Sequence, residues 1–191
     1  VFVVDLSPSM AYPMSEDAGT SGSYAQNAAD TRLYATTQAL NAAADTLMAD
    51  GNNRMAVVTF GSYASTMVPL GHYAKDENRD FFSYEGHRVS WGSVEGNLAF
   101  TAQNSDGWTQ DYISSTNPQA GVVQAYNVFD NATKPDDGLT HIPVIIMLTD
   151  GTPNQGNDSY MASDDWTSWW RVDASNYFTI IQTMAYRKGL I

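Results

Sequence analysis

The sequence predicts a single α/β domain with a doubly wound, mainly parallel central sheet. Two apolar segments, 1–4 and 142–148, each lead into an aspartate, a pattern typical of strands that are buried on both faces of a parallel sheet. Segments with helical periodicity alternate with the strands along the 191-residue chain. This alternation indicates right-handed crossovers, with helices on both faces and one antiparallel edge strand, a Rossmann-like arrangement.

Each expected element has its own local signal. In chain order we expect a strand at 1–4, a helix at 33–48, strands at 55–60 and 65–70, a helix starting at 116–118, a strand at 142–148 and a helix at 177–187. Asp30 or Thr31 is the expected N-cap of the first helix, and Gly51 is placed to end it. Pro118 suits the first turn of the second helix. Pro69 is tolerated in a strand only at a sheet edge, so we expect its strand to return antiparallel there.

Three long segments, 11–29, 71–115 and 152–174, lack periodicity, and we expect them to be loops. The middle segment carries so many aromatic residues that a packed insertion is expected. All five tryptophans lie outside every predicted strand and helix, at Trp91, Trp108, Trp166, Trp169 and Trp170. We expect most of them to pack within the insertions. Trp169 and Trp170, next to two aspartates, are the candidates for contact with a partner.

The composition indicates one domain that covers residues 1–191. A hydrophobic content of 43% is enough for one sizeable core. The chain begins inside an expected core strand, and its last helix should lead into another strand and helix. We therefore expect an excerpt of a longer protein, with a fold truncated at the C-terminus and with any signal or anchor outside the excerpt.

Charge and cysteine content exclude several classes of partner. Nine basic and 21 acidic residues give a net charge of −12, which disfavours nucleic acid and anionic membranes. The sequence has no cysteine, so it can form neither disulfides nor a thiolate metal site. No apolar run approaches the roughly 20 residues of a membrane-spanning helix.

Five oxygen-bearing side chains are expected at one edge of the sheet. Asp5, Ser7 and Ser9 follow the first strand, Asp150 follows the 142–148 strand, and Thr116 stands just before the second helix. Ligands of open α/β sheets bind at the carboxyl ends of the strands. Two carboxylates about 4 Å apart repel by about 1 kcal/mol in water and about 4 kcal/mol near a protein surface, which a bound cation would relieve. Oxygen donors of this kind suit Mg²⁺, with Mn²⁺ and Ca²⁺ as alternatives.

The order and context of these residues resemble a known family. The pattern is similar to the metal-ion-dependent adhesion site of von Willebrand factor type A domains, and it comprises Asp5-x-Ser7-x-Ser9, Thr116 and Thr149-Asp150-Gly151. The resemblance extends over the whole chain apart from its long loops. One departure is Pro8, where the family usually has glycine, and a second is the length of the loops.

The resemblance implies a role for each residue of the pattern. Ser7, Ser9 and Thr116 would be direct or conditional ligands of the cation. Asp5 and Asp150 would act largely through bound waters and hydrogen bonds to the other ligands. An aspartate or glutamate of a partner protein would complete the coordination, and movement of the Thr116 loop would couple ligand binding to the last helix.

The long loops resemble those of bacterial pilus-tip and cell-surface adhesins. This implies an extracellular binding module whose partner is a host extracellular matrix protein or another surface protein, with no membrane contact by the domain itself. The alternative is an intracellular module in a chelatase- or ATPase-linked assembly. A secretion signal or wall anchor in the flanking sequence favours adhesion, and a fused ATPase domain favours the alternative.

Enzymatic functions fit the sequence poorly. Aspartyl-phosphate hydrolases need a second acid at the position of Ser7. The chain has neither a P-loop lysine motif nor a G-x-G-x-x-G motif. No histidine or lysine is placed to act as a base beside Asp5 and Asp150. We therefore expect a binding protein rather than an enzyme.

Overall fold

A computed structural model describes residues 1–14, 25, 28–49, 51–73, 81–85, 88–93, 96–101 and 116–150. Its elements in chain order are β1 (Phe2–Asp5), η1 (Pro8–Ala11), η2 (Ala28–Asp30), α1 (Arg32–Met48), β2 (Met55–Phe60), β3 (Ala64–Gly71), β4 (Phe82–Glu85), β5 (Arg88–Ser93), β6 (Gly96–Thr101), α3 (Pro118–Asp130) and β7 (Ile146–Leu148). The predicted helix at 177–187, the loop at 152–174 and four of the tryptophans lie outside the described residues.

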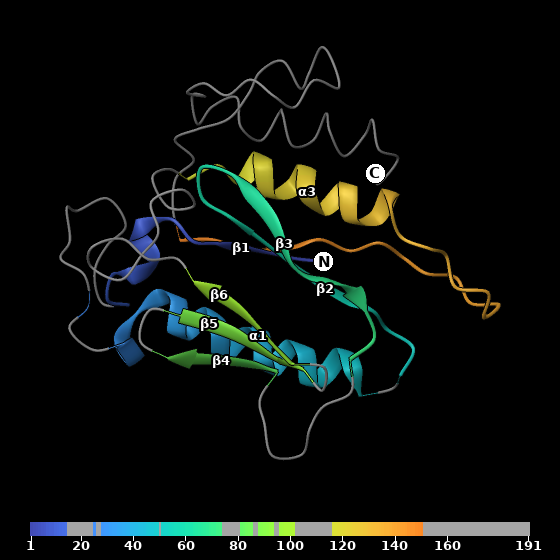
Figure 1. The fold of residues 1–191 in the computed structure, drawn as a ribbon, viewed down its shortest axis with the longest axis horizontal. Coiled ribbons are helices and arrows are strands. Elements are labelled where there is room, and N and C mark those ends of the chain that lie inside the picture. Colours follow the sequence, from blue (N-terminus) through green and yellow to red (C-terminus); the bar gives the residue numbers. More distant parts are fainter. Residues whose placement is uncertain are drawn as a thin grey trace, which may run out of the picture.

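The main sheet has the strand order β3-β2-β1-β7 (Figure 1). β1 runs parallel to both of its neighbours, with Val4 opposite Thr59 on β2 and Leu148 on β7. β3 is antiparallel to β2 and stands at the end of the strand order. The predicted mixed α/β architecture, with a mostly parallel sheet and one antiparallel strand, is confirmed in the described part of the chain.

The two long helices cover opposite faces of this sheet, as Figure 1 shows. Successive strand residues point to opposite faces, so alternate residues of one strand enter different cores. Phe2 and Val4 pack with α1, together with Leu33 and Leu40 of that helix. Val3 packs on the other face, in the core that holds the α3 side of the sheet.

Both helices start where the sequence predicts, and each has a side-chain cap. The Thr31 hydroxyl accepts a hydrogen bond of 3.0 Å from the Tyr34 amide, which makes Thr31 rather than Asp30 the N-cap of α1. Asn117 caps α3 through a 3.1 Å bond from the Ala120 amide to its Oδ1. These caps fix where each helix begins, and the cap of α3 directly follows the predicted site residue Thr116 in the chain.

Gly121 lets α3 approach the sheet closely. A Cβ at this position would lie 2.6 Å from Val3 Cγ1 and 2.8 Å from Phe60 Cδ1. Both of these side chains are buried in the core between α3 and the sheet. The absent side chain therefore sets the spacing between the start of α3 and the strands β1 and β2.

The segment 71–115, expected to be a loop that packs as an insertion, contains regular strands. It contains β4, β5 and β6, which form an antiparallel three-stranded sheet of their own (Figure 1). Asn41 of α1 anchors this sheet, because its Nδ2 donates to Phe82 O and its Oδ1 accepts from Phe82 N, both at 2.7 Å. The expectation that every tryptophan lies outside the strands was wrong for Trp91, which belongs to β5.

The strand predicted at 142–148 is shorter in the structure and less buried than its apolar sequence indicates. It begins at Ile146, which pairs with Phe2 at the start of β1. Residues before Ile146 extend beyond the start of β1, so Ile142 is 78% exposed and Val144 is 54% exposed.

The predicted loop at 11–29 is described at its two ends, which contain parts of the short 3-10 helices η1 and η2. Within the described ranges, no helix is long and apolar enough to cross a membrane.

Candidate metal centre

The carboxyl ends of β1 and β7 bring Asp5 and Asp150 to the same edge of the sheet. The two strands are parallel neighbours, so the residues that follow them leave the sheet side by side. The Thr149 hydroxyl donates a 2.6 Å hydrogen bond to Asp5 Oδ2. This contact joins two of the predicted motifs across 144 positions of the chain.

Asp5 is completely buried, and its two oxygens hold parts of the surrounding loops. Oδ2 accepts from Thr149, and Oδ1 accepts a 2.7 Å bond from the Ser7 amide. Burial raises the pKa of Asp5 to about 6, and the nearby Asp150 charge adds to this effect, while the bonds from Thr149 and Ser7 oppose it. Asp5 therefore positions the loop after β1 through the Ser7 amide. When ionised, it supplies a buried negative charge that water does not reach.

The hydroxyls of Ser7 and Ser9 connect this loop to Asp150. Ser7 Oγ lies 3.1 Å from Ser9 Oγ, and Ser9 Oγ donates a 2.9 Å hydrogen bond to Asp150 Oδ1. The short helix η1 places the two serines, and Pro8 occupies its first position, where a missing N–H costs nothing. The departure from glycine at Pro8 is thus compatible with a loop in which the Ser7 hydroxyl contacts Ser9 and the Ser9 hydroxyl contacts Asp150.

Thr116 lies at the same edge of the sheet. The residue after it, Asn117, donates from its backbone amide to Gly61 O at 3.0 Å and from Nδ2 to Ser62 O at 3.2 Å. Both acceptors belong to the turn that follows β2, the neighbour of β1. Thr116 itself is buried, with 6% of its surface exposed. Four of the predicted residues thus form one bonded network, and the bonds of Asn117 to the turn after β2 hold Thr116 at the same edge of the sheet.

Arg32 is a member of the network that the sequence reasoning missed. Its Nη1 forms an ion pair with Asp150 Oδ2, and its side chain is 9% exposed. The guanidinium carbon lies 5.9 Å from the centre of the Tyr12 ring, a cation–π distance. The available signal was a basic residue in the first turn of a helix, where the helix dipole disfavours positive charge.

The donor set fits a hard divalent cation. All of its side-chain donors are oxygens, from two carboxylates and several hydroxyls, which Mg²⁺ prefers. Neighbouring ligands of an octahedral Mg²⁺ are about 2.9 Å apart, given bonds of about 2.05 Å. The Ser7–Ser9 and Ser9–Asp150 oxygen distances of 3.1 and 2.9 Å match this spacing, as they also match ordinary hydrogen bonds.

The centre differs from metal sites that are built from carboxylates and imidazoles. In the part of the chain that the structure describes, no three His, Cys, Asp or Glu side chains group together to hold a metal ion. The predicted centre contains two carboxylates, with hydroxyls as its other donors, so it is not a site of that type. Trp169 and Trp170, the candidate partner-binding residues, lie outside the described residues.

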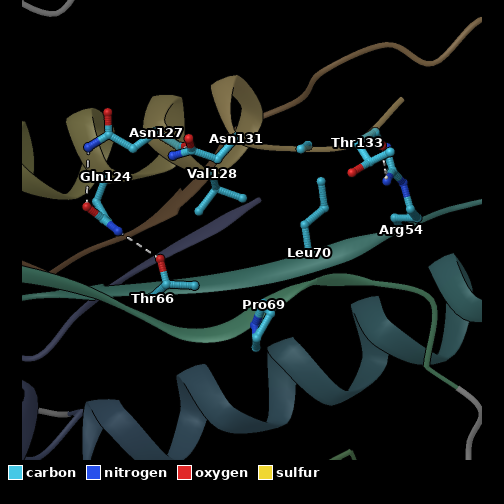
Figure 2. A pocket seen from close by; sticks show the side chains of 10 residues that line it. Arg54, Thr66, Pro69, Leu70, Gln124, Asn127, Val128, Asn131 and Thr133 are labelled. Carbon is cyan, nitrogen blue, oxygen red and sulfur yellow. Dashed lines mark hydrogen bonds between the residues drawn. The ribbon is translucent and has the colours of Figure 1, made fainter. Parts of the chain in front are cut away.

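Two hollows on the surface differ in their relation to this centre. One, of about 360 Å³, borders it directly and is lined by Met10, Arg32 and Asp150, among others. The other, of about 420 Å³, lies between α3 and β3 (Figure 2). Side-chain amides that line this second hollow form hydrogen bonds to other residues of its lining, as in the 2.9 Å bond from Gln124 Nε2 to Thr66 Oγ1. Of these two hollows, the first is the one lined by a residue of the centre, Asp150.

Comparison with known proteins does not assign the chain to a family. No protein family, curated protein or solved structure matches the chain. The resemblance to von Willebrand factor type A domains rests on the residues of the motif and on their contexts in the sequence.

Proposed function

We propose that the protein is a metal-dependent binding module in which Mg²⁺, or Mn²⁺ or Ca²⁺, sits among Asp5, Ser7, Ser9, Thr116 and Asp150. The observation that carries the proposal is the bonded chain from Ser7 through Ser9 to Asp150, with oxygen spacings of 3.1 and 2.9 Å. These three residues come from two sequence motifs predicted to act together.

The hydroxyls and the carboxylates would have different roles in holding the cation. The hydroxyls of Ser7, Ser9 and Thr116 are neutral donors, so they leave the cation with an incompletely neutralised charge. Asp5, which is buried, would supply negative charge and hold the Ser7 amide in place. When bound, the cation would act as a Lewis acid that attracts a negatively charged oxygen.

The partner would therefore present an aspartate or glutamate. A carboxylate is the partner group that best complements a cation held mainly by neutral oxygens. The hollow of about 360 Å³ beside Asp150 offers a place for such a side chain to enter. The long segments 11–29, 71–115 and 152–174 would set specificity, and their resemblance to the loops of adhesins makes a protein of the host matrix or of a cell surface the proposed partner. On this proposal the module acts outside the cell and is not an enzyme.

Selection from a phage-displayed random peptide library tests this proposal. The protein is immobilised in Mg²⁺ and bound phage are eluted with EDTA. We expect the eluted peptides to be enriched in Asp and Glu, and we expect this enrichment to be lost on Asp5→Asn protein. Equal enrichment on both proteins, or peptides without acidic residues, would contradict the proposal. The exposed-loop variant Asp136→Asn is the matched control and should behave like the wild type.

A further inference from the structure

We propose that Arg32 is an internal counter-ion that competes with the divalent cation for Asp150 and so weakens metal binding. The proposal rests on the proposed metal-binding function and adds a residue that tunes it. Its basis is the ion pair between Arg32 Nη1 and Asp150 Oδ2, which joins the start of α1 to the end of β7.

The position of Arg32 is unfavourable for the helix that carries it. Arg32 is the first residue of α1, and the first turn of this helix contains no acidic residue. The amino end of a helix carries partial positive charge, so a guanidinium there is destabilising unless an anion offsets it. Asp150 supplies that anion. The pair with Asp150 therefore accounts for a buried arginine in the first turn of the helix.

The guanidinium is also held in place by its surroundings. Its carbon lies 5.9 Å from the centre of the Tyr12 ring, and the Arg32 amide donates a 3.1 Å bond to Tyr12 O. The side chain is only 9% exposed. Arg32 is therefore positioned next to Asp150 by the fold and does not reach the carboxylate as a freely moving surface side chain.

Both carboxylate oxygens of Asp150 are engaged in this arrangement. Oδ1 accepts from Ser9 Oγ at 2.9 Å, and Oδ2 pairs with Arg32. A cation that uses Asp150, directly or through water, must share the carboxylate with a guanidinium of like charge. Arg32 also cancels one of the two carboxylate charges of the centre, leaving Asp5 to attract the cation. Removing the guanidinium charge should therefore tighten metal binding.

Calorimetric titration with Mg²⁺ of the Arg32→Met variant tests this inference. We expect the dissociation constant to fall by about tenfold or more, which corresponds to about 1.4 kcal/mol. The matched control is Arg54→Met, which removes the same charge from a half-buried arginine bonded to Thr133 O, beside the other hollow. Arg54→Met should bind Mg²⁺ with wild-type affinity. An unchanged or weakened affinity in Arg32→Met would overturn the inference.

A measurement on the wild-type protein covers the case in which Arg32→Met does not fold. The side-chain Nε–H NMR signal of Arg32 should shift as Mg²⁺ is added, whereas that of Arg54 should stay in place. An unmoved Arg32 signal at saturating Mg²⁺ would overturn the inference. If the wild type binds Mg²⁺ and Arg32→Met binds it equally well, the inference alone fails. If neither protein binds Mg²⁺, both the inference about Arg32 and the proposed function fail.

Discussion

Ser9 and Asp150 meet at the edge of the sheet, where Ser9 Oγ donates a 2.9 Å hydrogen bond to Asp150 Oδ1 across 141 positions of the chain. This contact joins the loop after β1 to the loop after β7. It exists because these strands are parallel neighbours, so both loops leave the sheet at the same edge. The contact is the structural basis for treating two short sequence motifs as one site.

The stability of the metal-free protein should depend on pH through Asp5. Burial raises the pKa of this carboxyl to about 6, from an ordinary value of 3.8. Between these pH values the folded protein keeps a proton that the unfolded chain has lost, so the contribution of Asp5 to stability is present below pH 4 and is lost as pH rises through 6. A pKa difference of about two between the folded and unfolded states corresponds to a change of about 3 kcal/mol in the free energy of unfolding.

The Asp5→Asn variant isolates this effect from the other carboxyl groups. The amide remains neutral, so the stability of the variant relative to the wild type should rise by up to about 3 kcal/mol between pH 4 and pH 7. Urea unfolding of both proteins in EDTA at several pH values measures the difference. A difference that does not change with pH would contradict the expectation.

Asn117 should stabilise the start of α3 and the turn after β2 together. Asn117→Ala removes the cap of the helix and the bond from Nδ2 to Ser62 O, and should cost about 2 kcal/mol. Asn117→Asp keeps the cap acceptor and loses the donor, so we expect roughly half of that loss. Chemical unfolding of both variants gives the comparison. If the two losses are equal, the cap contributes nothing, and if Asn117→Asp loses no stability, the bond to Ser62 contributes nothing.

Gly121 should be required for the close approach of α3 to the sheet. In Gly121→Ala the new methyl group would overlap Val3 and Phe60, and we expect a loss of about 1–3 kcal/mol. This loss runs against the intrinsic preference of helices for alanine, which favours the substitution by about 1 kcal/mol. Asp136→Ala, in the exposed segment after the same helix, is the control and should change stability by less than about 0.5 kcal/mol. A Gly121→Ala protein as stable as the wild type would show that the core adjusts freely.

Much of the main sheet could be predicted because its signals are local. The continuous apolar run of β2 gives a strand with the predicted bounds, Met55–Phe60. The helices follow from apolar spacing, from the capping residue Thr31 of α1 and from Pro118 in the first turn of α3. The site residues next to these strands could be named because a parallel sheet places the ends of its strands at one edge.

The missed features depend on contacts between distant parts of the chain. The sheet of β4, β5 and β6 was not predicted, since glycines and polar residues obscure any alternation in that segment. Its docking relies on Asn41 of α1, a residue whose role cannot be read locally. Arg32 and Asp150 are separated by 118 positions, so the arginine in the first turn of a helix indicates the need for an anion but not which residue supplies it.

Calorimetric titration of the wild type and Asp5→Asn with Mg²⁺ tests the central claim most directly. Asp5 holds the Ser7 amide and supplies buried negative charge to the centre, and its amide analogue has nearly the same shape. We predict saturable binding of one Mg²⁺ by the wild type and by the control variant Asp136→Asn, and loss of that binding in Asp5→Asn. Equal binding heats for wild type and Asp5→Asn would contradict the account.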